Sequence, residues 1–224
     1  MNSLKVRIIE NSNLFNNISN SAVLKRVLQT KEMLDNMYEQ LLKSLKVERE
    51  EEDYIIKGST MMIIPFYAEQ GALNSIIIDR FEAVKVKRKS QNIIDESCIY
   101  FASDMKGRIR SAAKILKGHQ MLPIVISKMN KTCMIPISSP YNKRCIWISY
   151  RHIVDITSYK RKSILTLENG QRFELNVSRK VMENKINRAN RLVNTYDIRN
   201  KEMQDTYKAN YIAETKVIYV PDLE

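Results

Sequence analysis

The sequence predicts an α+β fold: a strand-rich central domain with an antiparallel or mixed sheet, an N-terminal helix and a C-terminal helical segment. Apolar residues recur every three or four positions in the N-terminal part, short apolar or alternating runs fill the middle, and a helical pattern returns near the C-terminus. The domains expected from these patterns are an N-terminal helical extension in residues 1–53, a central domain in residues 54–200 and a C-terminal tail in residues 201–224.

The first predicted element is a helix over residues 20–47. Ser19, Asn20 or Ser21 is suited to cap its start. The helix either packs on the body of the protein or forms a short coiled coil, and Lys31 interrupts its apolar seam. The acidic run EREEED that follows is expected to mark a boundary. The apolar positions that define the helix are Leu24, Val27, Leu34, Tyr38, Leu41 and Leu45.

Short strands are predicted from Tyr54 onward. DYIIKGSTMMIIPF indicates two strands around Gly58-Ser59, and SIIIDRF indicates another. In AVKVKRKS the valines and lysines alternate, which is typical of a half-buried strand with a basic outer face. Further strands are expected in MLPIVIS, TCMIPIS and CIWISYRHIVDI.

The segment SCIYFASDMKGRIRSAAKIL is interpreted as a buried strand followed by a basic turn and helix start. Ser97 to Phe101 is expected to end the strand in the core, with Cys98, Tyr100 and Phe101 as core residues. Gly107 is expected to supply a positive φ or room for a close backbone approach.

The segment SILTLENGQRFELNVS predicts a β-hairpin. Asn169-Gly170 suits a two-residue type I′ turn, because both central residues of that turn need a positive φ. The residues expected on the inner face are Leu165, Leu167, Phe173, Leu175 and Val177.

A second helix is predicted after Ser178, which is a suitable N-cap. The tail after Asn200 has a mixed pattern and ends in a possible strand, KVIYV. The apolar stripe expected on this helix consists of Val181, Ile186, Ala189, Leu192, Val193 and Tyr196.

The charge of the chain is unevenly distributed. The formal net charge is +12, but residues 1–56 hold eight Lys/Arg against nine Asp/Glu, so residues 57–224 carry the whole excess. A domain with this much positive charge attracts polyanions, among which nucleic acid is the first candidate. A basic surface that serves only solubility is the alternative.

The sequence gives little support for an enzyme, a metal- or cofactor-binding protein, or a secreted or membrane protein. Cys98, Cys133 and Cys145 form no CxxC pair, and the histidines are His119 and His152. No P-loop, GxGxxG, HExxH or paired-carboxylate motif is present, so no metal or cofactor is expected. A Cys–His enzyme or a magnesium-dependent nuclease stays a weak alternative. The N-terminus lacks a signal-peptide pattern and no apolar run is long enough to cross a membrane, so a cytoplasmic location is expected.

The basic clusters are the candidate functional sites, because Lys and Arg side chains contact nucleic-acid phosphates. The alternative for each cluster is a solvated surface. His152 is either a phosphate or base contact or a structural histidine, and Trp147 is expected in the core. The first group of candidates is Lys106, Gly107, Arg108, Arg110, Lys114 and Lys117; the second is Lys143, Arg144, Arg151 and His152; the third is Lys85 and Lys87, with Lys89 on the same strand face.

From about Tyr54 to about Asn200 the order of motifs resembles the ComK family of competence transcription factors from Gram-positive bacteria. The landmarks are the SCIYF segment with Gly107-Arg108, then MLPIVIS, then IPISSP followed by CIWISYRHI, and finally the Asn169-Gly170 hairpin that leads through LNVS into a polar helix. The sequence departs from the family pattern at Ala102, where glycine is expected, at Met105, where an aromatic residue is expected, and at Ile109, where a basic residue is expected.

This resemblance implies a cytoplasmic, nucleoid-associated activator of DNA-uptake genes. Family members bind paired A/T-rich boxes in double-stranded DNA through the minor groove, as dimers that assemble on DNA. They are controlled by an adaptor of a Clp protease. The alternative function is a non-catalytic interaction module whose basic surface binds RNA or an acidic protein partner.

Overall fold

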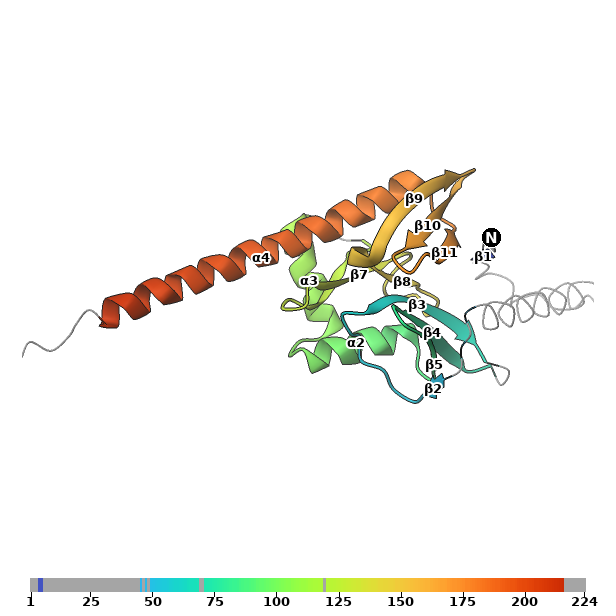
Figure 1. Cartoon of the computed structure of the whole chain (residues 1–224), viewed down its shortest axis with the longest axis horizontal. Helices are drawn as coiled ribbons and strands as arrows, with labels where there is room; N and C mark the ends of the chain where they lie inside the picture. The colour runs from blue at the N-terminus through green and yellow to red at the C-terminus, as the bar shows by residue number, and fades with distance from the viewer. Residues whose placement is uncertain are drawn as a thin grey trace, which may run out of the picture.

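The computed structural model describes residues 4–5, 45, 47, 49–68, 71–118 and 120–215, with side chains described up to residue 208. The helix predicted over residues 20–47 and the strand predicted in residues 216–220 lie outside the described residues, except for Leu45 and Val47. In the described part, two sheets and the helices α2, α3 and α4 form the domain (Figure 1). The α+β prediction is confirmed.

The larger sheet has seven strands in the order β2-β5-β4-β3-β8-β7-β6. All pairs are antiparallel except β2 with β5, which are parallel. Of the two strands predicted around Gly58-Ser59, only the second forms; Tyr54 and Ile56 are buried without belonging to a strand. The strands are β2 (Arg49–Glu51), β3 (Thr60–Tyr67), β4 (Leu73–Asp79), β5 (Ala83–Val86), β6 (Ile124–Ser127), β7 (Thr132–Pro136) and β8 (Trp147–Ser149).

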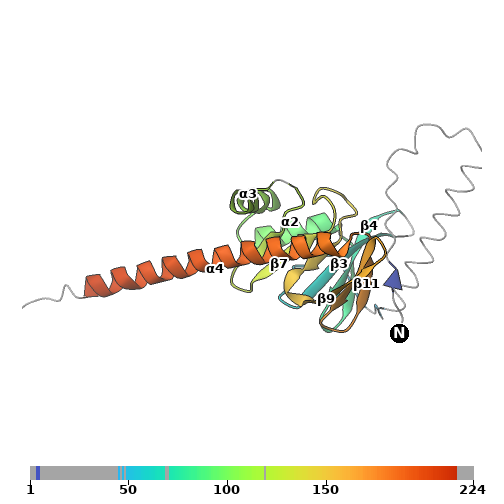
Figure 2. The same cartoon turned by 90° about the horizontal axis from the view of Figure 1, so that it is seen from above.

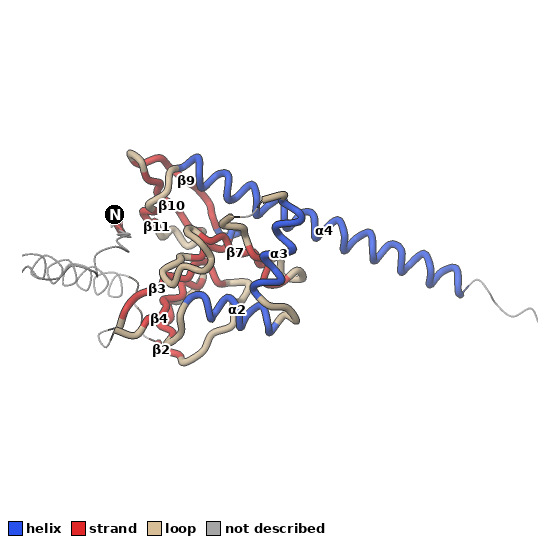
Figure 3. Tube along the Cα trace, turned by 180° about the vertical axis from the view of Figure 1, so that it is seen from behind, coloured by secondary structure: helices blue, strands red, loops and turns tan. Residues whose placement is uncertain are grey.

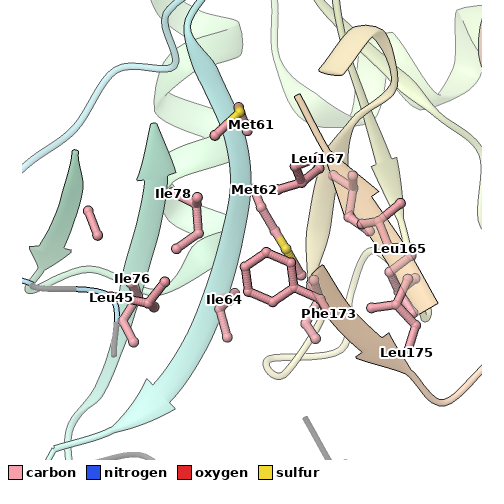
Figure 4. Packing of buried hydrophobic residues seen from close by; sticks show 14 of the residues in the cluster. Leu45, Met61, Met62, Ile64, Ile76, Ile78, Leu165, Leu167, Phe173 and Leu175 are labelled. Atoms are coloured by element: carbon pink, nitrogen blue, oxygen red, sulfur yellow. The ribbon is translucent and has the colours of Figure 1, made fainter. Parts of the chain in front are cut away.

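The smaller sheet has four strands in the order β1-β11-β10-β9. A short 3₁₀ helix, η1 (Tyr150–His152), joins the two sheets in the chain. Apolar side chains from the two sheets meet in a shared core, in which Phe173 lies near Met62 (Figure 4). The strands are β1 (Leu4–Lys5), β9 (Ile153–Tyr159), β10 (Lys162–Leu167) and β11 (Arg172–Leu175).

The β10–β11 hairpin is confirmed, but its turn differs from the prediction. The Gly170 N–H donates to the Leu167 carbonyl and the Leu167 N–H donates to the Gln171 carbonyl, each at 2.9 Å, so the loop has three residues. Gly170 has a φ of 79°, whereas Asn169 does not have a positive φ. A three-residue loop of this kind is a type I turn followed by a left-handed residue, so the type I′ prediction is wrong.

Helices α2 (Ser90–Tyr100) and α3 (Met105–Leu116) cover the face of the larger sheet opposite the smaller one (Figures 1 and 2). The strand predicted at residues 97–101 is wrong, because Ser97 to Tyr100 form the last turn of α2. Cys98 is buried, but Tyr100 is 69% exposed and is not a core residue. A short apolar run does not distinguish a strand from a helix, which explains the error.

The chain turns at Ala102 and not at Gly107. Ala102 has a φ of 57°, in the left-handed region that favours glycine. Gly107 lies in the first turn of α3 without a positive φ, so that part of its prediction is wrong. It does leave room for a close approach, because a Cβ at this position would lie 3.3 Å from Asp104 Oδ2. Its N–H donates to the carboxylate of Asp104, the N-cap, at 2.6 Å. Asp104 therefore determines where α3 begins.

Helix α4 (Arg179–Thr215) crosses the domain and continues beyond it (Figures 1, 2 and 3). The Val181 N–H donates to Ser178 Oγ at 3.4 Å, consistent with the predicted N-cap. The helix passes through residue 200, so residues 201–215 of the predicted tail are helical. The predicted stripe is confirmed except for Val181, which is 43% exposed. The buried residues of the helix include Met182, Lys185, Ala189, Leu192, Val193 and Tyr196.

Candidate nucleic-acid interface

A continuous basic ridge runs along the exposed side of α3. Lys106, Arg110 and Lys114 are each four residues apart and all are exposed, whereas Met105 and Ala112 on the other side are buried. Residues four apart lie on one helix face, so the three cations form a single line. Within the described part of the chain none of the three forms an ion pair with a carboxylate. Their charges are therefore available to an external anion.

Lys117 extends this ridge beyond the end of the helix. It is exposed and is the C-cap of α3, with a φ of 52°. From Lys106 to Lys117 the ridge is about 17 Å long at 1.5 Å per residue. We call Lys106, Arg110, Lys114 and Lys117 the α3 ridge.

Arg108, also predicted as a contact, does not belong to the α3 ridge. Its side chain is partly buried, and Nη2 donates to the Phe101 carbonyl at 3.0 Å and to the Ile126 carbonyl at 3.5 Å. Arg108 thus connects the end of α2 to β6. These two hydrogen bonds hold α3, the helix that carries the ridge, against α2 and β6.

Helix α4 lies beside α3. Ser111 Oγ and the Tyr196 hydroxyl share a hydrogen bond with 2.5 Å between the oxygens, and Ala112, Ala189 and Leu192 pack in one cluster. This packing holds α3 between α4 and the larger sheet. The helix that carries the α3 ridge therefore packs against α4 on one side and the larger sheet on the other.

A pocket of about 500 Å³ lies between the loop that follows α3 and the first turns of α4. Lys185 lines it and is only 6% exposed. Its Nζ donates to the Pro136 carbonyl at 2.7 Å and lies 3.6 Å from Met121 Sδ. Burial lowers the pKa of Lys185 to about 8. The predicted apolar stripe of this helix did not include Lys185, although its three- and four-residue spacing to Met182 and Ala189 was a signal of burial.

The second predicted group is not one site. Arg144 precedes β8, where its Nε donates to the Tyr67 hydroxyl at 3.4 Å and its guanidinium lies 4.9 Å from the Tyr67 ring centre. Arg151 follows β8, and its Nη1 donates to the Asn130 carbonyl at 2.9 Å. The two arginines therefore lie at opposite ends of β8. Lys143 is exposed beside Arg144, and Trp147 is buried as predicted.

His152 is an interior residue. Its side chain is 1% exposed, with Nε2 at 2.8 Å from the Gly58 carbonyl oxygen and Nδ1 at 2.8 Å from Glu168 Oε1. Gly58 precedes β3 and Glu168 follows β10, so these partners hold the ring between a loop of the larger sheet and a loop of the smaller sheet. The structural interpretation of His152 fits this position, and the ring has no surface to offer to DNA in this conformation.

Of the third predicted group, Lys85 lies on β5 and Lys87 directly follows it, whereas Lys89 is the N-cap of α2 and not a strand residue. Lys85 and Lys87 are paired with acidic residues. Lys85 Nζ lies 2.8 Å from Glu50 Oε2, and Lys87 Nζ lies 2.6 Å from Glu52 Oε1. Strand β5 lies next to the β2 edge of the larger sheet, whereas α3 contacts β6 at the opposite edge. The α3 ridge and the β5 lysines are therefore two separate basic surfaces.

The cysteines are unsuited to nucleophilic catalysis. Cys98, Cys133 and Cys145 are all buried. Burial raises the pKa of Cys98 to about 12 and also raises the pKa values of Cys133 and Cys145, so all three thiols are protonated at neutral pH. Among the described residues no group of three His, Cys, Asp or Glu side chains is placed to hold a metal ion. No described helix is long and apolar enough to cross a membrane.

A basic ridge without carboxylate partners among the described residues, on a packed α+β domain, is the kind of site that suits a polyanion. The family model described as ComK protein matches residues 51–201, and the chain therefore belongs to the ComK family. A competence transcription factor from Bacillus subtilis (strain 168) is 28% identical over 146 residues, which cover 65% of this chain and 76% of the relative. No solved structure matches the chain. Family membership makes the protein a regulator of transcription in competence.

Proposed function

We propose that the protein activates competence genes by binding paired A/T-rich boxes in double-stranded DNA, with the α3 ridge as its main contact to the phosphate backbone. The observation that carries this proposal is the line of exposed lysines and arginine on α3 without carboxylate partners in the described part of the chain. Contacts of this kind supply affinity and position the protein, but they do not specify sequence.

Preference for A/T-rich DNA needs a different contact. A narrow A/T-rich minor groove has an enhanced negative potential that attracts arginine. Arg110 is the arginine at the centre of the α3 ridge, and its exposed side chain is free to enter such a groove. We assign the minor-groove contact to Arg110, and Lys106, Lys114 and Lys117 to flanking phosphates. DNA binding of this kind places the protein at the nucleoid.

Assembly on paired boxes is assigned to the projecting end of α4. Ile198, Met203 and Tyr207 are 51%, 72% and 72% exposed, although they are large apolar residues. A second copy of the helix would bury these exposed apolar side chains, which makes it the natural partner of this end of α4. Removal of residues 201–224 should convert dimers to monomers in light scattering after size-exclusion chromatography. Recognition by an adaptor of a Clp protease is a further proposal that rests on family membership.

The salt dependence of DNA binding tests the role of the α3 ridge. In the triple variant Lys106→Gln, Lys114→Gln and Lys117→Gln, three phosphate contacts are lost, so the slope of log K against log salt should decrease in magnitude by about 2.7. Gel-shift titrations on A/T-rich duplex at several salt concentrations measure this slope. Circular dichroism checks that the variant is folded.

A matched variant separates local contacts from net charge. Lys160→Gln, Arg161→Gln and Lys180→Gln remove the same charge from exposed positions on the β9–β10 turn and the start of α4. This variant should keep most of the slope. Equal loss in both variants would refute the α3 ridge as the contact surface. Binding-site selection on random duplex tests sequence preference, and equal affinity for RNA and every duplex would favour the alternative of a general interaction module.

A further inference from the structure

Residues 49–53 of the acidic run EREEED, which the sequence suggested as a boundary, lie against the basic strand β5. Strand β2 pairs in parallel with β5, with Arg49 opposite Val84, Glu50 opposite Lys85 and Glu51 opposite Val86. The pairing continues past the strand, where the Lys87 N–H donates to the Glu51 carbonyl at 2.9 Å. The acidic segment therefore forms the edge of the larger sheet.

Each basic side chain on this edge has an acidic partner from the same segment. Lys85 pairs with Glu50 at 2.8 Å, and Lys87 pairs with Glu52 at 2.6 Å. Lys87 also lies 3.4 Å from Glu50, and Arg88 Nε lies 2.5 Å from Asp53. The hydrogen bond from Lys85 is the main reason that the pKa of Glu50 is lowered, and Glu52 and Glu50 raise the pKa of Lys87. We call Glu50, Glu52 and Asp53 the acidic strap.

The side chains of the acidic strap are exposed, whereas residues on either side of the strap are buried in the cores of the domain. Before it, Leu45 is buried in the core between the two sheets; after it, Tyr54 and Ile56 are buried in the core beneath α2. The segment thus passes from one face of the larger sheet to the other around its edge. None of the side chains of β2 is buried. Backbone hydrogen bonds and exposed ion pairs hold the strap to β5, and exposed ion pairs are weak and screened by salt.

We propose that the edge formed by Lys85, Lys87 and Arg88 is a second surface for the DNA backbone, and that the acidic strap occupies it in place of phosphates. This inference rests on the proposed DNA-binding function. Lys85 and Lys87 are two residues apart, so they lie on one side of the strand about 7 Å apart and can both face one phosphate backbone. Carboxylates and phosphate oxygens accept the same hydrogen bonds from lysine and arginine, so the two ligands compete. The strap thereby restrains binding at this edge.

Neutralising the strap in the full-length protein tests the inference. In the triple variant Glu50→Gln, Glu52→Gln and Asp53→Asn, the three basic side chains are free to contact phosphates. The slope of log K against log salt should become steeper by about 2.7, which corresponds to an additional fortyfold change in affinity, roughly, across a fourfold change in salt. Gel shifts on the same A/T-rich duplex from low to high salt measure the effect.

The control changes the net charge equally at other acidic residues. Asp155→Asn, Glu183→Gln and Asp197→Asn remove three negative charges outside the strap and outside the projecting end of α4. Glu183 and Asp197 pair with Arg179 and Lys131, as the strap acids pair with their cations. A steeper slope in the strap variant only would support the inference. An equal increase in both variants would show a general charge effect and overturn it, and so would an unchanged slope.

A combined variant tests whether the increase in the salt slope depends on the basic residues of the β5 edge. Adding Lys85→Gln, Lys87→Gln and Arg88→Gln to the neutralised strap should return the slope to about the wild-type value. A gain that survives these three changes would overturn the inference. Failure of the underlying function is distinguishable, because the wild-type protein would then show no salt-dependent, A/T-preferring binding and no dependence on the α3 ridge.

Discussion

The buried amine of Lys185 makes the stability of the protein depend on pH. Its pKa falls from an ordinary value of 10.5 to about 8, and the largest cause is burial. Below about pH 8 both the folded and the unfolded chain hold the proton, and the buried charge lowers the free energy of unfolding by its full amount. As the pH rises from about 8 to about 10.5, the folded state loses the proton first and this destabilisation disappears.

The expected magnitude follows from the size of the pKa shift. A shift of about 2.5 units corresponds to about 3 kcal/mol. Between about pH 7 and about pH 9.5 the part that is relieved is about 2 kcal/mol, because the unfolded chain still holds most of its protons at the upper limit. In Lys185→Met this titration is absent. The stability advantage of the variant over the wild type should therefore decrease by about 2 kcal/mol over that interval, or about 4–8 °C in Tm for a chain of this size.

Urea unfolding of the wild type and of Lys185→Met at a series of pH values measures this difference. Cys98 and Cys133 also titrate on unfolding, but they do so equally in both proteins and cancel in the comparison. Cys145 interacts electrostatically with Lys185, so both proteins carry Cys145→Ala. Lys180→Met, at an exposed position on the same helix, is the control and should show a constant difference from the wild type. A difference between Lys185→Met and the wild type that does not change with pH, or that grows, would refute a buried amine with a lowered pKa.

Three further predictions concern local structure. Ala102→Gly should stabilise the protein by about 1 kcal/mol, because Ala102 has a φ of 57° and glycine adopts this conformation without strain; thermal unfolding measures the change. Asp104→Ala should destabilise it by about 1 kcal/mol through loss of the α3 N-cap, as measured by urea unfolding. Cys98, Cys133 and Cys145 should react with a thiol reagent at pH 8 only after unfolding, because burial keeps them protonated and inaccessible.

Each of these predictions has a contrary outcome. Destabilisation by Ala102→Gly would mean that residue 102 does not hold the left-handed conformation. Ala102→Val, by contrast, is expected to be less stable than the wild type, because a β-branched residue is disfavoured at a positive φ. An unchanged stability in Asp104→Ala would show that its carboxylate does not cap α3. Rapid modification of a thiol in the folded protein would place that cysteine at the surface.

Most strands were predictable because their burial is recorded in local sequence patterns. Val84 and Val86 alternate with lysine, and they are buried as the alternation requires. The end of α2 was mistaken for a strand because Cys98, Ile99, Tyr100 and Phe101 form a short apolar run without a visible period. Only the packing of α2 on the sheet shows that Cys98 faces inward and Tyr100 outward.

The basic character of the candidate site was determined by the sequence, but the availability of each charge was not. Lys106, Arg110 and Lys114 were identified from composition and spacing, and their common helix face follows from the period of an α-helix. The pairing of Lys85 with Glu50 joins residues 35 positions apart. Local periodicity contains no information about such a partner.

The sequence by itself therefore determined the α+β class, the faces of most strands, the β10–β11 hairpin and the excess of positive charge, because these depend on neighbouring residues. Tertiary structure decided which cations are neutralised, which one is buried and where the chain turns. Glu50 meets Lys85 only because β2 pairs with β5, and Lys185 is buried only because α4 packs against β7. Electrostatic compensation and desolvation depend on distance in space, which the order of residues along the chain does not give.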